Sequence, residues 1–154
     1  MEVINEVVPS DPKRIAEMAE KGPEGPIFMV NLLKFKDKAE YEDGRETDLT
    51  GRQAYQLYGA GVASLITEYG GRILFMADVT FLSLGQVEEL WDEVAIAAYP
   101  DRNALFQMSS SKAWQDLAVH RAAGLAGQLN LESVMPSFAW GLPWMELFKK
   151  EFEQ

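Results

Sequence analysis

The stretch IFMVNLLKF, residues 27–35, decides the fold of this 154-residue chain. Branched and aromatic side chains dominate it, a Gly-Pro pair precedes it and charged residues follow it, which is the pattern of a β-strand. Every second residue from Phe28 to Leu32 is apolar, whereas the alternate set contains Asn31. Because successive side chains of a strand point to opposite faces, this alternation predicts a sheet with one uniformly apolar face and one mixed face.

The segments on both sides of this strand alternate between helical and extended patterns. Thr50 and Gln53 match a capping box, which predicts that a helix begins there. The expected elements, in chain order, are a helix over 11–21, the strand 27–35, a helix over 50–69, strands over 72–84 and 90–99, a helical region over 100–124 that is broken at 109–111, a strand over 128–138 and a helix over 143–152. The core order predicts an α+β, ferredoxin-like βαββαβ fold, in which a four-stranded antiparallel sheet carries helices on one face.

Composition indicates one domain and excludes several classes of protein. With 47% hydrophobic residues and no internal repeat, residues 1–154 are expected to form a single domain, with a core over about 27–140 and helical extensions at both ends. The absence of cysteine excludes disulfides, thiolate metal sites and a cysteine nucleophile. A formal charge of −10 disfavours nucleic-acid and membrane-surface partners. No basic, apolar leader and no apolar run of roughly 18 residues is present, so a cytoplasmic protein is expected.

The division into apolar and mixed sets recurs in the strands expected at 72–84 and 90–99. We expect the apolar sets to face the helices and the mixed sets to form the open face of the sheet. A face of mixed character is expected to meet a partner or a ligand. The mixed sets are Met29, Asn31, Leu33 and Phe35 in the first strand, Arg72, Leu74, Met76, Asp78, Thr80 and Leu82 in the second, and Trp91, Glu93, Ala95, Ala97 and Tyr99 in the third.

Several short motifs occur in the order typical of one family. They are NLLKF at 31–35, Tyr41 with Gly44, TGRQAY at 50–55, GGR at 70–72, WDEV at 91–94, YPDR at 99–102 and HRAAGL at 120–125. Over about residues 27–135 the chain resembles the domain of unknown function thirteen-thirty family, a branch of the dimeric α/β-barrel superfamily. The resemblance implies a homodimer whose two sheets lie face to face around a barrel interior. The family has no established reaction, so the resemblance implies no catalytic residue.

Polar and aromatic side chains of the mixed sets would converge on that barrel interior, where Ala95 and Ala97 leave space. The candidate ligand-binding residues are Asn31, Arg72, Trp91 and Tyr99, with Asp78 close by. They suit a small, partly aromatic or carbonyl-bearing molecule. The alternative is a packed dimer interface in which Arg72 pairs with Asp78 and nothing binds.

Arg121 falls within the apolar stripe of the helix that ends near residue 124. A guanidinium in such a stripe must reach solvent or meet a carboxylate. One expectation is therefore an ion pair with Glu93, Asp101 or Glu132. The other is recognition of a ligand carboxylate, which adds Arg121 to the candidate binding residues.

Two side chains are candidates for acid–base catalysis. His120 is the only histidine of the chain, and it lies at the edge of the stripe that contains Arg121. It could act as an acid or base, or as a haem ligand as in some members of the superfamily, and the alternative is a surface residue. Tyr58 lies with Tyr55 in the first turns of the helix after residue 50, and it could act as an acid only if a cation lowered its pKa. The alternative is that both tyrosines simply pack.

The loop over 36–50 is rich in carboxylates but lacks the spacing of an EF-hand, so it is expected to be a solvated lid or rim. No metal site and no cofactor is expected, and no phosphate loop or serine-hydrolase motif is present.

Two hypotheses about function follow from these observations. The first is a cytosolic homodimer, or larger homo-oligomer, with a small-molecule cavity on the sheet face and a cofactor-independent oxygenase- or isomerase-like activity. The second is a non-catalytic ligand-binding or assembly module with a filled dimer interior.

Overall fold

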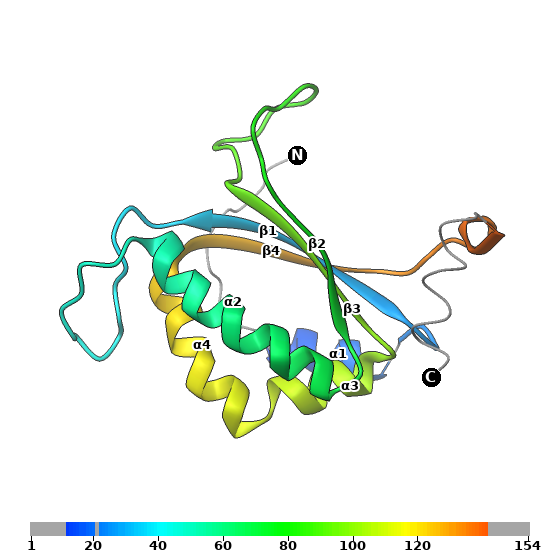
Figure 1. Cartoon of the computed structure of the whole chain (residues 1–154). Coiled ribbons are helices and arrows are strands. Elements are labelled where there is room, and N and C mark those ends of the chain that lie inside the picture. The colour runs from blue at the N-terminus through cyan, green and yellow to red at the C-terminus, as the bar shows by residue number, and fades with distance from the viewer. Residues whose placement is uncertain (1–11, 21, 142–154) are drawn as a thin grey trace.

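The computed structural model describes residues 12–20 and 22–141 (Figure 1). In chain order the elements are α1 (Pro12–Glu20), β1 (Ile27–Phe35), α2 (Gly51–Glu68), β2 (Arg72–Asp78), β3 (Glu93–Tyr99), α3 (Arg102–Ser109), α4 (Lys112–Gly124), β4 (Leu125–Ser133) and a short 3-10 helix, η1 (Ser137–Gly141). The predicted ferredoxin-like α+β fold is confirmed by this order. The helix expected over 143–152 lies outside the described residues. Among the described helices, none combines the length and the apolar character needed to cross a bilayer.

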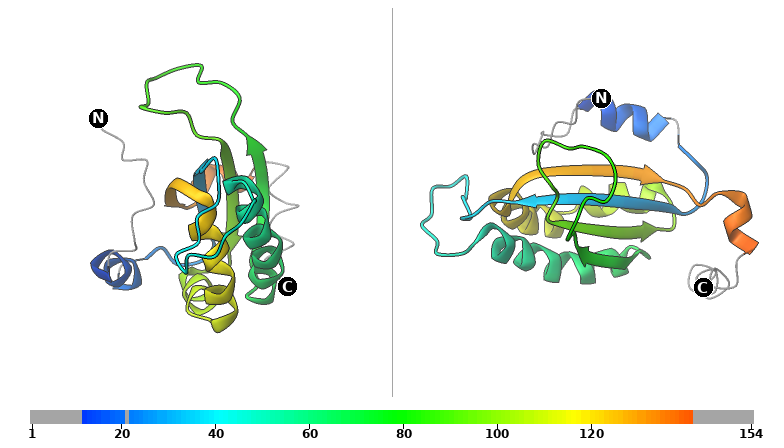
Figure 2. Two further views of the ribbon diagram at one scale, coloured as in Figure 1. Left: turned by 90° about the vertical axis from the view of Figure 1, so that its left-hand side faces the viewer. Right: turned by 90° about the horizontal axis from the view of Figure 1, so that it is seen from above.

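The four strands form an antiparallel sheet in the order β2-β3-β1-β4. β1 lies in the middle, and its Asn31 is paired with Ala95 of β3 on one side and with Asn130 of β4 on the other. Helices α2, α3 and α4 cover one face of the sheet, whereas no described helix covers the opposite face (Figures 1 and 2). We call this second face the uncovered face.

Side-chain caps mark where the helices begin. The Thr50 hydroxyl accepts a hydrogen bond from Gln53 N at 3.2 Å, and Gln53 Oε1 accepts one from Thr50 N at 2.9 Å. This reciprocal pair is the predicted capping box at the start of α2. Asp101 and Ser111 cap α3 and α4 by accepting from backbone N–H groups. The break predicted at 109–111 is confirmed, because the cap at Ser111 starts a new helix there.

Two strands are shorter than predicted. β2 ends at Asp78 and β3 begins at Glu93, so residues 79–92 form a loop instead of extending both strands, and β4 begins at Leu125 instead of 128. The loop rises on the side of the sheet away from the helices (Figure 1). Phe81 and Leu84 within it are 80% and 90% exposed, so an apolar run that resembles a strand is here a projecting segment.

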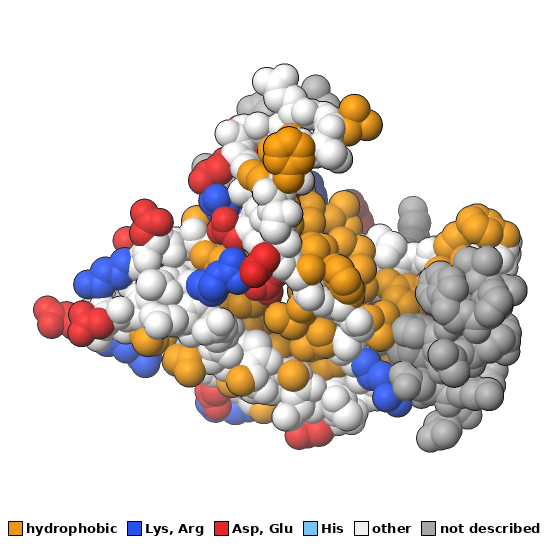
Figure 3. All heavy atoms as spheres, turned by 45° about the horizontal axis from the view of Figure 1, so that its top comes forward, with side chains coloured by type: hydrophobic (Ala, Val, Ile, Leu, Met, Phe, Trp, Pro, Cys, Tyr) orange, Lys and Arg blue, Asp and Glu red, His pale blue; other side chains and the backbone are white. Residues whose placement is uncertain are grey.

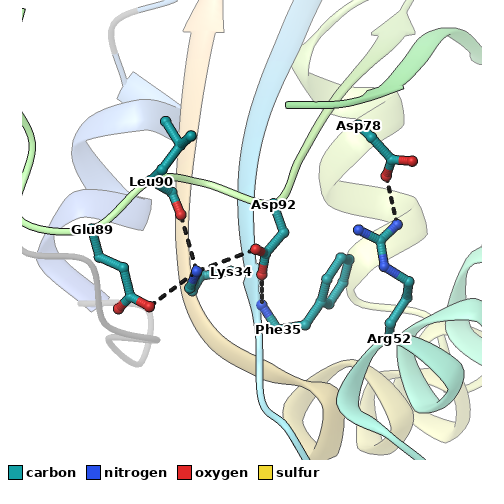
Figure 4. Close-up of polar contacts among 7 residues, drawn as sticks. All are labelled: Lys34, Phe35, Arg52, Asp78, Glu89, Leu90 and Asp92. Atoms are coloured by element: carbon teal, nitrogen blue, oxygen red, sulfur yellow. Dashed lines mark hydrogen bonds and ion pairs between the residues drawn. The ribbon is translucent and has the colours of Figure 1, made fainter. Parts of the chain in front are cut away.

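Hydrogen bonds to β1 hold the base of this loop (Figure 4). Asp92 accepts a hydrogen bond from Phe35 N at 2.8 Å through its carboxylate, and its own N donates to Leu33 O at 2.8 Å. Lys34 Nζ lies 3.0 Å from Leu90 O and pairs with the carboxylates of Asp92 and Glu89. The loop therefore leaves the sheet from a fixed position beside the end of β1.

The predicted assignment of the two sheet faces is wrong by one residue in β1 and β3. In β2 the register shift between Ile73 and Phe75 leaves Arg72 and Ile73 on their predicted faces and reverses the residues from Phe75 to Asp78. Met29 is buried in one cluster with Val62 of α2 and Met108 of α3, so its alternate set faces the helices. Residues that are directly opposite in the register share a face. On the helix side the rows are Ile73, Ala97, Met29 and Glu132; Met76, Ala95, Asn31 and Asn130; and Asp78, Glu93, Leu33 and Gln128.

The uncovered face consequently carries the apolar sets of β1 and β3, and its polar residues Arg72 and Ser133 lie in one row. Its rows are Phe75, Ile96, Val30 and Leu131; Ala77, Val94, Leu32 and Leu129; and Arg72, Ala98, Phe28 and Ser133. Figure 3, in which the top of Figure 1 comes forward, shows apolar side chains gathered beside the projecting loop. The mixed sets face the helices because their polar groups bond to one another and border a cavity. Strand parity alone does not reveal that arrangement.

Helices α2 and α4 approach each other closely where two buried glycines meet. A Cβ on Gly124 would lie 2.4 Å from Gly51 O, and one on Gly51 would lie 2.3 Å from Lys36 O. Backbone hydrogen bonds join the same three segments, since Lys36 N donates to Gly124 O at 2.9 Å and Gly51 N donates to Lys36 O at 3.0 Å. The ends of β1 and α4 and the start of α2 are thereby locked together.

Gly124→Ala is expected to destabilise the protein by about 1–3 kcal/mol, because its methyl group would push against backbone that cannot move aside. Gly59→Ala is the matched control, since a Cβ there meets nothing within 4 Å, and it should stabilise α2 by roughly 0.5–1 kcal/mol. Urea unfolding followed by circular dichroism measures both changes. Equal effects of the two substitutions would contradict the packing described for Gly124.

Candidate functional site

A cavity of about 310 Å³ lies between the helix-facing side of the sheet and helices α2, α3 and α4. Small side chains at Ala95 and Ala97 of β3 leave the space on the sheet side. Tyr55 and Tyr58 of α2 and Trp114 of α4 supply aromatic walls. The volume falls at the lower end of the range found for small-molecule sites.

The structure brings together some of the predicted site residues. Asn31, Tyr99, Arg121 and Tyr58 all line this cavity, although it lies on the helix side and not on the uncovered face as predicted. Arg72 is opposite Ala98 and belongs to the uncovered face.

Trp91 and His120 are not among the residues that line the cavity. Trp91 is buried just before β3. His120 Nδ1 lies 2.7 Å from the hydroxyl of Tyr41, and the two rings meet edge to face. Tyr41 packs near Ala39, Ala54 and Ala123, so this histidine is part of the contact between the 36–50 loop and the helices.

Hydrogen bonds connect three polar side chains along one wall of the cavity. Arg121 Nη2 donates to Gln128 Oε1, and Gln128 Nε2 donates to Asn31 Oδ1 at 2.8 Å. Asn31 Nδ2 in turn donates to Met29 O at 3.1 Å and to Ala95 O at 3.5 Å. Both amide groups are therefore held in one orientation, and they hold the Arg121 guanidinium at the cavity.

The expected ion pair of Arg121 with Glu93, Asp101 or Glu132 is wrong. Glu132 pairs with Arg102, Asp101 caps α3, and Glu93 pairs with Arg52. Within residues 12–20 and 22–141, no carboxylate forms an ion pair with Arg121. The competing carboxylates have other partners, and Arg121 is left with the neutral Gln128. The guanidinium is thus available to an anion in the cavity.

Glu93 is the residue that the sequence analysis missed as part of the site. It is 8% exposed, it lines the cavity, and its Oε2 lies 3.1 Å from Arg52 Nη1. Its other oxygen, Oε1, is buried and has no hydrogen-bond partner. The available signal was its place in the mixed set of the strand EVAIAAY, beside Ala95, Ala97 and Tyr99, and this signal did not depend on which face that set occupies.

The environment of Glu93 raises the pKa of its carboxyl group. Burial is the main cause, the nearby charge of Asp78 adds to it, and the Arg52 guanidinium opposes it. Arg52 interacts with other groups as well as with Glu93. Its Nη1 atom lies only 2.7 Å from the Asp78 carboxylate, and the Arg52 guanidinium stacks over the Phe35 ring at 4.7 Å from the ring centroid (Figure 4). Arg52 therefore orients Glu93 without fully compensating its burial.

The tyrosines of the cavity keep their protons. Burial raises the pKa of the Tyr55, Tyr58 and Tyr99 hydroxyls, and for the first two the charge of Arg121 only partly offsets this rise. A general acid near neutral pH needs a lowered pKa, so these directions argue against Tyr58 in that role. The rings of Tyr55 and Tyr58 lie 5.4 Å apart and form a stable aromatic wall.

The raised pKa of Glu93 predicts a pH-dependent stability. Because the folded protein holds this proton more tightly than the unfolded chain, the contribution is fully present below the ordinary pKa of 4.5 and is lost as pH rises through the folded pKa. Glu93→Gln removes this titration, so wild-type stability relative to E93Q should fall as pH rises above about 4.5 in urea unfolding.

Glu40→Gln is the control for this measurement, because the Lys36 ammonium lowers the pKa of the exposed Glu40 carboxyl. Wild-type stability relative to E40Q should not fall over the same pH interval. A parallel fall for both variants would contradict the assignment to Glu93.

The part of the chain that the structure describes contains no group of three or more His, Asp or Glu side chains that could hold a metal ion. The donors around the cavity are amides, hydroxyls and a guanidinium, with the single carboxylate of Glu93. This set suits an organic molecule with polar ends better than it suits a cation.

Comparison with solved structures gives the same fold. The crystal structure of RPA0582, a protein of unknown function from Rhodopseudomonas palustris, is 26% identical with a TM-score of 0.76, over 86% of this chain and 100% of that one. A methylated form of RPA0582 is 28% identical with a TM-score of 0.77, over 87% and 99% of the two chains. A dimeric ferredoxin-like protein of unknown function from Bacteroides fragilis is only 8% identical with a TM-score of 0.49, over 71% and 96%, and carries no argument for this chain.

No family model matches the sequence, and no curated protein matches it. The resemblance to the domain of unknown function thirteen-thirty family therefore stays a prediction. What the comparisons add is that this chain is similar, over most of its length, to RPA0582, a protein of unknown function.

Proposed function

We propose that this protein binds a small organic acid in the cavity between the sheet and the helices. The observation that carries the proposal is Arg121, a guanidinium on the cavity wall whose hydrogen-bond partner is the neutral amide of Gln128. Arg121 is half-buried on the cavity wall, and an anionic ligand would supply the carboxylate that its described neighbours do not. The two amides behind Arg121 fix its position before any ligand arrives, which favours binding.

The walls indicate the body of the ligand. Tyr55, Tyr58 and Trp114 offer aromatic surface, and Ile66 and Met108 add aliphatic surface. An aromatic or unsaturated ring of modest size, joined to a carboxylate, matches these walls and the volume of about 310 Å³. A cofactor-independent isomerase- or oxygenase-like reaction is one use of such a site, and non-catalytic binding is the alternative.

Phenylacetate and its neutral counterpart phenylacetamide test the role of Arg121. Wild-type protein should bind the carboxylate about 10- to 100-fold more tightly, because a charge-assisted hydrogen bond replaces a neutral one. Arg121→Met should abolish this preference, and Arg121→Lys should restore part of it, as measured by isothermal titration calorimetry.

Arg45→Met is the matched control for charge, since Arg45 is exposed and pairs with Asp43 in the 36–50 loop. It should bind both compounds as wild type does. If wild type and R121M bind the two compounds equally well, the protein is not an acid-binding protein of the kind proposed.

We further propose that two copies of this chain associate through their uncovered sheet faces. The central rows of that face are apolar on all four strands, from Phe75 and Ala77 of β2 to Leu129 and Leu131 of β4. Phe75 is 51% and Leu131 is 47% exposed in the single chain. A contiguous apolar surface of this kind on a sheet is typical of an interface. A dimer formed there leaves the cavity of each subunit on the other side of the sheet.

Leu131→Glu should convert the dimer to a monomer, because its carboxylate would be buried against apolar side chains of the second copy. Leu57→Glu is the matched control, since Leu57 is 48% exposed on α2. Sedimentation velocity distinguishes the species. A monomeric wild type, or equal behaviour of both variants, would contradict the interface.

A further inference from the structure

We infer that Glu93 is the proton acceptor of a proton-transfer reaction in this cavity, acting on an enolisable oxo acid whose developing oxyanion faces Arg121. The inference rests on the proposed acid-binding function and adds the reaction class. It comes from Glu93 and Gln128, which lie in one row of side chains that crosses the sheet beneath the helices.

The register places Glu93 two strands away from Gln128, the residue that contacts Arg121. Glu93 of β3 is directly opposite Leu33 of β1, and Leu33 is directly opposite Gln128 of β4, the residue that holds Arg121. Neighbouring strands lie about 4.8 Å apart, so the backbones at Glu93 and Gln128 are roughly 10 Å apart. Glu93, Gln128 and Arg121 all line the cavity, whereas Leu33 is fully buried and is not part of its lining. The cavity therefore presents a carboxylate and a guanidinium to one bound molecule.

The unsatisfied oxygen of Glu93 distinguishes this residue from a purely structural ion-pair partner. Oε2 is held by Arg52 at 3.1 Å, and this contact orients the carboxylate, but Oε1 is buried without a hydrogen-bond partner. Arg52 does not depend on Glu93, because its shorter contact, at 2.7 Å, is with Asp78. A buried acceptor atom that bonds to nothing is costly to a fold, and a proton or donor group from a bound molecule would satisfy it.

No other side chain of the cavity competes for this role. The three tyrosines keep their protons, Asn31 and Gln128 are neutral amides, and Arg121 is always a cation. Glu93 is therefore the one base among the described lining residues. Its burial strengthens it as a base, because desolvation disfavours the ionised form.

The proposed step is the removal of a proton from the carbon next to a ketone. The C–H bond breaks, its electron pair forms the C=C bond of an enolate, and the carbonyl electrons move onto oxygen. The proton forms a bond with Glu93 Oε1, and the oxyanion is stabilised by the Arg121 guanidinium. When the proton on Glu93 is replaced by one from solvent before it returns, reprotonation of the same carbon exchanges that carbon's hydrogen with solvent. Reprotonation of a different carbon isomerises the molecule. No oxidant or reductant is consumed.

Phenylpyruvate in D₂O is the probe for this step, because it combines an aromatic ring, a carboxylate and an enolisable methylene group. Proton NMR measures loss of the methylene signal, and calorimetry under the same conditions measures binding. The purified wild-type protein should exchange the methylene protons for deuterium faster than a solution without protein does. Glu93→Gln should lower the accelerated rate by about 10²- to 10⁴-fold while binding phenylpyruvate as tightly as wild type or more tightly. Glu40→Gln, an exposed carboxylate paired with Lys36, should leave both quantities unchanged.

The outcomes separate this inference from the proposed function. Binding without accelerated exchange, or equal exchange by wild type and E93Q, overturns the role of Glu93 and leaves acid binding intact. Absence of saturable binding overturns the proposed function and the inference with it. If circular dichroism shows that E93Q does not fold, Glu93→Asp replaces it, since it keeps the charge and withdraws the carboxylate by one methylene group. E93D should then retain binding and lose most of the exchange, and full exchange by E93D would overturn the inference.

Discussion

Pairing of β1 with both β3 and β4 is the constraint on which the rest of the structure depends. A central antiparallel strand forms backbone hydrogen bonds on both edges, so its register sets which side chains of three strands share a face. The row of Glu93, Leu33 and Gln128 and the row of Ile96, Val30 and Leu131 both follow from it. A shift of one residue would exchange the polar lining of the cavity for the apolar surface on the opposite side of the sheet.

The two faces separate two roles that the sequence analysis treated as competitors for one surface. A ligand cavity and a filled dimer interior were alternatives there, because both were assigned to the mixed face. In the structure the cavity lies under the helices, and the uncovered face is apolar. Binding in each subunit and association of subunits are therefore compatible. The projecting loop, held to β1 through Lys34 and Asp92, borders the uncovered face without closing the cavity.

Two charged side chains of the cavity, Glu93 and Arg121, are only partly paired with other protein groups. Asp78 takes the closer contact with Arg52, which leaves Glu93 with one unsatisfied oxygen. Arg102 pairs with Glu132, and that pairing leaves Arg121 with an amide in place of a carboxylate. Burial of such groups lowers the stability of the folded protein, and natural proteins tolerate that loss most often at functional sites. The close contact of Gly51 with Gly124 holds the start of α2 against the end of α4, the helix that carries Arg121.

The order of the elements, the capping box at Thr50, the break before Lys112 and the ferredoxin-like topology could all be predicted from the sequence. These features depend on local chemistry: a side chain that accepts from a nearby N–H, or a run of branched residues between turns. The sequence also singled out Asn31, Tyr99 and Arg121, because a polar group within an apolar pattern is visible in one dimension. Only the tertiary structure decided which face those residues occupy and which carboxylate meets which guanidinium. Alternation specifies two faces without labelling them, and the ion pairs join residues far apart in the chain, such as Arg52 with Glu93, whose distance is set by packing alone.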